Sequence, residues 1–380
     1  MGKLLIVKKT LLFLSIVLST TMGVSQCPGV ITITSQEEID DFLTNYPNCD
    51  GTGLFLDING QNSNINNLQG LSHLTTIGTL GIFFTELTDL SGLDNIAETS
   101  RLRILGNFNL LSFDGLESLQ SVGFGGFRIV LNSALVSLEG LSGLIEVDGD
   151  FNIEVNNALE SLNGLNNLTR VGGSFEIKSQ QSLINLLGLE SLEQVGSTSA
   201  DTFYLFNSEL VETLEGLENL RTVNGTLRIR LFNSLNSLSG FSGLETVTTR
   251  VNLQDNAQLS FCGIDLICNN LDNTNIELIF ANNALGCSSI QEVVASCLLS
   301  LNELDLSNAF TLYPNPVSEI LQIHTSEGVV LQKTTVYSLL GKELIATSEE
   351  TIDFSALSEG LYFVGVLTNL GRSLKMILKE

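Results

Sequence analysis

The chain has 380 residues, of which 43% are hydrophobic and 16% are charged, and this composition supports a large buried core rather than a disordered chain. Its 42 acidic residues outnumber 17 basic ones, giving a net charge of −25, so a protein that binds the nucleic-acid backbone is excluded. The two histidines, His73 and His324, are too few for a His-rich metal site.

Residues 1–26 have the three parts of a secretory signal peptide. Lys3, Lys8 and Lys9 form a positive leader, an apolar run covers 11–18, and small residues at 23–25 precede Gln26. That run is shorter than the roughly 18 residues of a membrane-spanning helix, and no later stretch reaches that length. We therefore expect an exported mature chain without a transmembrane segment; the alternative for 1–26 is an N-terminal membrane anchor.

All six cysteines flank the central part of the chain, which defines an N-terminal cap at 27–50 and a Cys-rich C-terminal cap at 262–297. An even number in an exported chain favours disulfides. Cys27 and Cys49 form one candidate pair, whereas Cys262, Cys268, Cys287 and Cys297 allow three pairings. The alternative of a zinc site lacks a CxxC spacing. Short helices are expected at 35–42, where Ser35 and Glu38 can form a capping box, and at 268–271 and 289–297.

Between the caps, residues 51–261 contain one motif eight times. The motif is Leu-x-Gly-Leu-x-x-Leu with small variations, and it recurs every 22 to 28 residues; its glycines are Gly70, Gly92, Gly115, Gly140, Gly164, Gly188, Gly216 and Gly240. A fixed period of about 24 residues predicts a solenoid of about eight repeats.

Within each repeat, the alternating Phe-x-Ile segments, as at 127–129, 151–153 and 175–177, predict half-buried strands. Their apolar side is expected to point into the coil, and the strands are expected to stack into a parallel sheet. Asparagines that follow these strands are expected to bond to backbone groups of neighbouring coils and to form a ladder. The members expected are Asn107, Asn132, Asn156, Asn207 and Asn256. Phe84, Gln180 and Phe232 are expected to interrupt that ladder.

The 24-residue Leu-x-x-Leu-x-x-Val-x-Gly-x-Phe-x-Ile coil with Cys-bearing ends resembles the receptor L-domain family over residues 27–297. The resemblance implies a right-handed, leucine-rich β-helical solenoid with a binding role and no catalysis. Ordinary leucine-rich repeats are the nearest alternative.

A linker at 298–311 leads to a second domain at 312–380. Six segments of strand-like alternation, at 321–324, 334–339, 342–345, 352–354, 361–367 and 374–378, predict a small antiparallel β-sandwich. The domain resembles the type A C-terminal sorting domain of the type IX secretion system. The residues that carry the resemblance include Tyr313, Pro314, Asn315, Pro316, Gly341, Gly360, Tyr362 and Lys375. This implies the type IX secretion machinery as a partner and a secreted or surface-attached product; the alternative is a β-sandwich with a binding function of its own.

No motif for catalysis, a cofactor or a metal stands out, so the sequence predicts a non-enzyme without a cofactor. Asp148 and Asp150 flank a turn glycine and are expected to be solvated surface. A polysaccharide-acting enzyme and a structural surface-layer component stay open as alternatives.

Scarce basic and aromatic side chains gather at outward positions of the predicted strands. The seven candidate ligand-binding residues are Arg103, Arg128, Lys178, Tyr204, Phe206, Arg228 and Arg230. We expect this face to recognise an extracellular glycan or protein. The alternative is that cross-strand Arg–Glu pairs only stabilise neighbouring strands.

Overall fold

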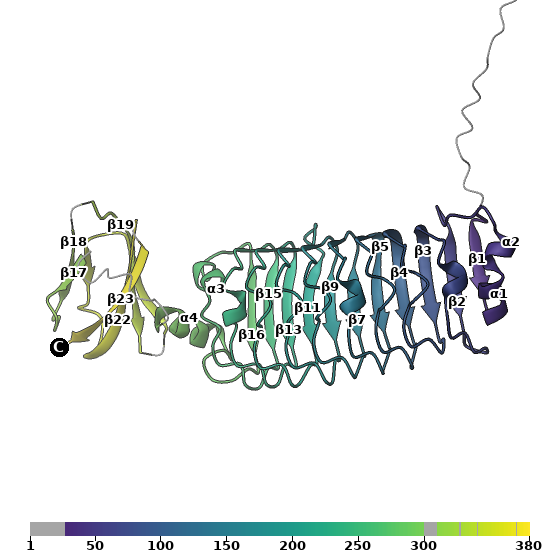
Figure 1. The fold of residues 1–380 in the computed structure, drawn as a ribbon. Helices are drawn as coiled ribbons and strands as arrows, with labels where there is room; N and C mark the ends of the chain where they lie inside the picture. Colours follow the sequence, from purple (N-terminus) through teal and green to yellow (C-terminus); the bar gives the residue numbers. More distant parts are fainter. Residues whose placement is uncertain (1–26, 300–309, 327, 340, 370) are drawn as a thin grey trace, which may run out of the picture.

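The computed structural model describes residues 27–299, 310–326, 328–339, 341–369 and 371–380. The fold is mainly β: parallel strands lie side by side along an elongated solenoid with short helices at both ends, and a smaller antiparallel domain follows (Figure 1). The predicted signal peptide at 1–26 and most of the predicted linker at 298–311 lie outside the described residues. No described helix combines the length and the hydrophobicity needed to cross a bilayer.

One wall of the solenoid is a parallel sheet that we call the long ladder. Its strands, in spatial order, are β1 (Val30–Ile33), β2 (Phe55–Asn59), β3 (Thr76–Phe83), β4 (Glu98–Leu105), β5 (Ser121–Val130), β7 (Phe151–Glu154), β9 (Phe175–Lys178), β11 (Thr202–Phe206), β13 (Thr226–Arg230), β15 (Arg250–Gln254) and β16 (Glu277–Ala281). The ladder therefore continues on both sides of 51–261, because β1 and β16 belong to the regions predicted as caps.

The long strand β5 pairs with two strands of the next coil. Its first residues pair with β6 (Glu146–Val147), and its last residues pair with β7. The first pairing starts a short ladder of two-residue strands, continued by β8 (Arg170–Val171), β10 (Gln194–Val195), β12 (Thr222–Val223) and β14 (Thr246–Val247). From β5 onward each coil thus has a corner between two parallel ladders.

The inward phenylalanines form a continuous stack in the core. Phe127, Phe151, Phe175 and Phe203 are fully buried, with ring centroids 4.9, 5.1 and 5.6 Å apart along the series. Each fully buried ring contributes about 1.5–3 kcal/mol of hydrophobic free energy. The predicted inward orientation of the Phe-x-Ile pairs is confirmed.

The repeat glycines permit the coils to approach closely. In the coil that contains Gly164, φ is +111°, and a Cβ there would lie 1.9 Å from the carbonyl oxygen of Leu138. The Gly164 N–H donates to the side-chain oxygen of Asn166, two residues later. In three other coils the residue two positions after the repeat glycine is a serine. There the glycine lies in a 3₁₀ turn; these turns are Gln69–Leu71, Glu139–Leu141 and Ser239–Phe241.

The asparagine ladder is present, but part of its predicted membership is wrong. The Oδ1 atom of Asn132 accepts the backbone N–H of Asn107, and its Nδ2 donates to the carbonyl of Ile104. Gln180 continues the ladder instead of breaking it, because its side-chain oxygen accepts the N–H of Asn156. The equivalent position in the next coil is Ser208 and not Asn207.

The conformation of the residue before each ladder position explains why the ladder residue is Ser208 and not Asn207. That preceding residue adopts a left-handed conformation in coil after coil, with φ of 60° at Leu131, 55° at Val155 and 55° at Asn207. Non-glycine residues adopt this conformation at a cost of about 1–2 kcal/mol each. The side-chain bonds of the following ladder residue hold the turn in place.

Disulfides and short helices lie at both ends of the solenoid. The pairs are Cys27 with Cys49, Cys262 with Cys287, and Cys268 with Cys297, so the prediction of disulfides is confirmed. The helices are α1 (Gln36–Asp40), α2 (Phe42–Asn45), α3 (Asp265–Asn269) and α4 (Ile290–Leu299). The predicted capping box between Ser35 and Glu38 begins α1, whereas the helix predicted at 268–271 starts earlier, at Asp265.

The C-terminal domain is a β-sandwich, as predicted. One sheet contains β17 (Phe310–Tyr313), β18 (Ile320–Thr325) and β21 (Thr351–Asp353); the other contains β20 (Glu343–Thr347), β19 (Leu331–Ser338), β22 (Gly360–Thr368) and β23 (Gly371–Lys379). All pairings within these two sheets are antiparallel. Buried side chains from both sheets, such as Leu321 and Val364, meet in one core.

Candidate functional site

The seven residues predicted to bind a ligand all lie on the outer face of the long ladder, in two neighbouring columns. Strand pairing places Arg103, Arg128, Tyr204 and Arg228 in the first column, and Lys178, Phe206 and Arg230 in the second. The first column also contains Asp57, Gly81, Asn152, Glu176 and Asn252. Side chains in one column are about 4.8 Å apart from strand to strand.

Three of the five basic residues are neutralised by acidic neighbours. Lys178 Nζ lies 2.8 Å from Glu176 and 3.5 Å from Glu154. Burial opposes the charged form of Lys178, but these two carboxylates outweigh it and raise its pKa. The pair with Glu154 links two neighbouring strands, β7 and β9, as the alternative of cross-strand stabilisation expects.

Arg230 and Arg103 are the other two basic residues that pair with carboxylates. Arg230 Nε is 2.7 Å from Asp255, whose pKa is lowered by a hydrogen bond from Asn282 and then by Arg230. Arg103 Nη2 reaches across Gly81 to Asp57 at 3.0 Å, and its guanidinium lies 5.2 Å from the ring of Phe83. A side chain at position 81 would collide with Asp57, so the glycine leaves room for this pair.

The other two arginines are differently placed. The guanidinium of Arg228 lies over the ring of Tyr204, 4.7 Å from its centroid, and the Tyr204 ring is 5.5 Å from that of Phe206. We call these three residues the aromatic cluster; all are half-buried. Arg128 is exposed and has no ionic or hydrogen-bonding partner for its side chain among the residues that the structure describes.

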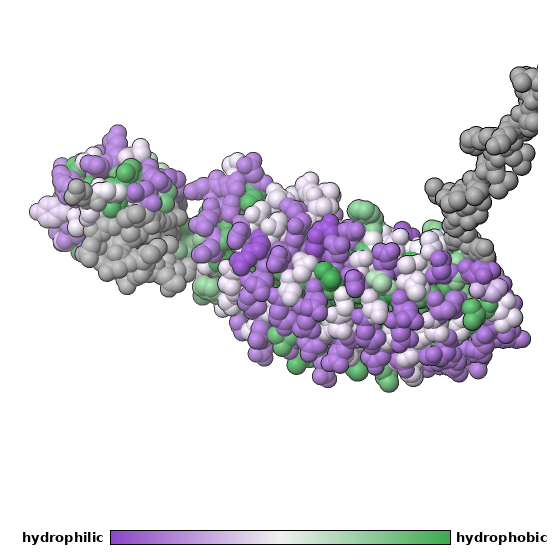
Figure 2. Space-filling model, turned by 45° about the horizontal axis from the view of Figure 1, so that its top comes forward, coloured by the Kyte–Doolittle hydropathy of each residue, from purple (hydrophilic) through white to green (hydrophobic). Residues whose placement is uncertain are grey.

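Sequence reasoning missed a group of apolar side chains beside these columns. On β3, β4 and β5 the second column holds Phe83, Leu105 and Val130, and the turns that follow expose Phe84 at 42% and Phe108 at 57%. The next two residues of the same column, Glu154 and Lys178, are charged. These hydrophobic residues can be read directly from the sequence, but only the strand register shows that they are neighbours. Figure 2 shows a mostly hydrophilic face on which hydrophobic residues occur in small groups.

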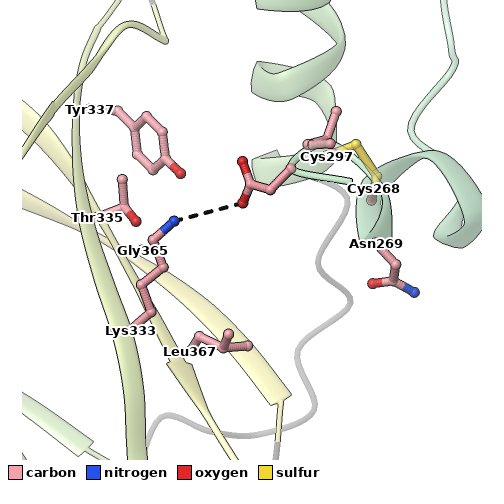
Figure 3. Close-up of a pocket in the computed structure, with 10 residues that line it drawn as sticks. Cys268, Asn269, Cys297, Lys333, Thr335, Tyr337, Gly365 and Leu367 are labelled. Carbon is pink, nitrogen blue, oxygen red and sulfur yellow. Dashed lines mark ion pairs between the residues drawn. A yellow bond between two sulfur atoms is a disulfide. The ribbon is translucent and has the colours of Figure 1, made fainter. Parts of the chain in front are cut away.

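A pocket of about 310 Å³ lies between the C-terminal end of the solenoid and the outer face of β19 and β22. The disulfide of Cys268 and Cys297 forms one wall, and the side chains of Lys333, Thr335 and Tyr337 project from the opposite sheet (Figure 3). Lys333 Nζ is 3.7 Å from Asp272 across the pocket. Within the described part of the chain, no three His, Cys, Asp or Glu side chains are grouped so that they could hold a metal ion.

The predicted sorting-signal residues have distinct structural roles. Asn315, in the Tyr313-Pro314-Asn315-Pro316 segment, bonds to the backbone of the last strand through Met376 and Leu378. The segment is thereby tied to β23, while Tyr313 itself is 67% exposed.

The remaining predicted sorting-signal residues lie inside the sandwich or in its turns. Lys375 donates to the Phe310 carbonyl and lies 4.7 Å from its ring centroid, and the Tyr362 hydroxyl donates to the Ser358 carbonyl. Gly341 and Gly360 have positive φ.

Comparison with known families identifies the second domain. Residues 311–380 match the family model of the secretion system C-terminal sorting domain. No curated protein is significantly similar to the chain. The molecule is therefore a β-solenoid carrying a sorting domain of the type IX secretion system, and it is exported to the cell surface or secreted. The receptor L-domain resemblance of the solenoid remains a prediction.

Proposed function

We propose that the solenoid is a non-catalytic binding module, displayed on the cell surface or released, that recognises an extracellular glycan or protein through the outer face of the long ladder. The observation that carries the proposal is the aromatic cluster of Tyr204, Phe206 and Arg228. Half-buried aromatic rings and an arginine supply large contact area with little loss of side-chain freedom on binding.

The charge pattern narrows what the face can recognise. Arg103, Lys178 and Arg230 are paired with carboxylates, so the face lacks the uniform positive field that a polyanion would need. Arg128 is left as an unpaired donor between two aromatic–cation contacts, Arg103 with Phe83 and Arg228 with Tyr204. Five strand intervals separate those contacts, a distance of about 24 Å, which suits an extended ligand lying along the solenoid.

A glycan array and a panel of extracellular matrix proteins test this function with the purified full-length chain. We expect the double variant Arg128→Glu/Arg228→Glu and the single variant Tyr204→Ala to lose the recognised ligand. Arg221→Glu, which reverses the charge of an exposed arginine next to the short ladder, serves as the charge-reversal control and should bind normally.

Unchanged binding by both outer-face variants would contradict the proposal. The two alternative functions give different results in the same samples. A surface-layer component would self-associate in size-exclusion chromatography without binding any ligand. A polysaccharide-acting enzyme would release reducing ends from an array glycan.

A further inference from the structure

A second recess lies at the corner where the short ladder begins, away from the two columns of the outer face. It encloses about 350 Å³. Its walls include Thr52, Thr76, Glu98, Ser100, Ser121 and Asp148, which come from five successive coils. We call this recess the corner groove.

A β-bulge in β5 shapes one side of the corner groove. Thr99 pairs with Val122 and Arg101 pairs with Gly126, so Gly123, Phe124 and Gly125 lie opposite the single residue Ser100. Bulges of this kind re-aim side chains. Phe124 is 86% exposed, and it directly follows Gly123, whose backbone lines the groove. The bulge therefore places an exposed aromatic residue directly next to a residue of the groove lining.

The groove lining is rich in hydrogen-bonding groups and has no basic side chain. The hydroxyls of Thr52 and Thr76 are 3.2 Å apart. Asp148 is held by Arg170 at 2.7 Å. Glu98, in contrast, is exposed and makes no ion pair or side-chain hydrogen bond to any described residue, so its carboxylate is available to a ligand.

This chemistry excludes phosphate and sulfate as ligands, because nothing in the groove would balance their charge. A ligand with many hydroxyl groups satisfies the lining better. Its hydroxyls can donate to Glu98 and exchange hydrogen bonds with the threonine and serine side chains, while its C–H face packs on the ring of Phe124. From this arrangement we infer that the corner groove is a saccharide-binding subsite for neutral sugars, separate from the outer face and independent of the function proposed for it.

Isothermal titration of the full-length chain with cellohexaose, laminarihexaose, xylohexaose and mannohexaose tests the inference. At least one hexasaccharide should bind, and Phe124→Ala and Glu98→Gln should each weaken that binding tenfold or more. Two matched controls should stay within twofold of the unmodified chain. Leu285→Ala removes an equally exposed apolar side chain, 85% exposed, at the far end of the solenoid. Glu193→Gln changes another exposed carboxylate that, like Glu98, makes no ion pair or side-chain hydrogen bond to a described residue, and that lies outside the groove.

Three results would overturn the inference: no binding of any hexasaccharide, equal binding by the groove variants, or an equal loss in the controls. A lysine-rich octapeptide is titrated in parallel, and its binding in place of the sugars would assign the groove to basic peptides instead. The Arg128→Glu/Arg228→Glu variant should retain hexasaccharide binding, so failure of the outer-face proposal is distinguishable from failure of this one. Thermal unfolding of every variant identifies those that do not fold.

Discussion

Asn156 accepts the backbone N–H of Asn132 through its side-chain oxygen at 3.0 Å, and Asn132 repeats this bond toward Asn107. The three residues are fully buried and belong to successive coils. The bond therefore joins coils at a turn where the backbone has left the parallel ladders, and it satisfies polar groups that water cannot reach.

Replacing a ladder asparagine should destabilise the solenoid. In Asn132→Ser the shorter side chain leaves the Asn107 N–H and the Ile104 carbonyl without their partners, which costs about 2–4 kcal/mol. Urea unfolding measures the change. Asn236→Ser, which changes an exposed asparagine elsewhere in the solenoid, should cost less than about 0.5 kcal/mol. Equal stability of the two variants would contradict the structural role of the ladder.

The reverse substitution should stabilise the coil where the ladder is interrupted. Ser208 is fully buried and its hydroxyl has no hydrogen-bonding partner among the described residues. The preceding residue, Asn207, already has the left-handed φ of 55° found before the ladder asparagines. We expect Ser208→Asn to restore the coil-to-coil bonds and to raise the free energy of unfolding by about 1 kcal/mol. A lower melting temperature would show that this coil lacks the space for them.

A methyl group on a repeat glycine should be costly. Gly164→Ala would place Cβ 1.9 Å from the Leu138 carbonyl oxygen and would require an alanine at φ +111°. The combined clash and strain should destabilise the fold by about 2–5 kcal/mol. Gly29→Ala is the matched control, since nothing lies within 4 Å of its added Cβ. Similar urea midpoints for both variants would disprove the close approach of the coils.

Asp255 should make the stability of the last coils depend on pH. Its pKa is lowered below the ordinary value of 3.8 by Asn282 and Arg230, so the unfolded chain binds a proton more readily than the folded chain. Its stabilising contribution is complete above pH 3.8 and is lost as the pH falls through the folded pKa. The chain should therefore be more stable than Asp255→Asn at pH 6, and this difference should shrink toward pH 3. Melting curves at both pH values measure it, and a difference that grew on acidification would contradict the assignment.

The period and the alternation of the repeats were enough to predict the solenoid, its inward Phe-x-Ile pairs and the sandwich that follows. These features follow from spacing along the chain, which the sequence displays directly. The ladder position was predicted one residue too early in two coils because the left-handed turn accepts residues as different as Phe84, Val155 and Asn207. No residue type marks that turn.

The candidate site was predicted less completely for a different reason. The positions of the seven residues on one face follow from alternation, but their partners follow from coil register. Asp57 and Arg103 are 46 residues apart in sequence, and only the stacking of β2, β3 and β4 brings them within 3.0 Å. The glycines around Phe124 stand out in the sequence. That they form a bulge could not be predicted, because the bulge exists only where the neighbouring strand β4 has fewer residues at the corner.

The disulfide-tied ends have a consequence for how the molecule exists outside the cell. Every parallel ladder finishes in a strand whose outer edge can pair with another chain, and identical coils would then add end to end into a filament. Here Cys27 and Cys49 tether the segment that holds β1, α1 and α2, while Cys268 and Cys297 hold α3 against α4 beyond β16. Because both ends replace part of the regular coil with disulfide-tied helices, we expect them to oppose the end-to-end addition of further copies of the chain.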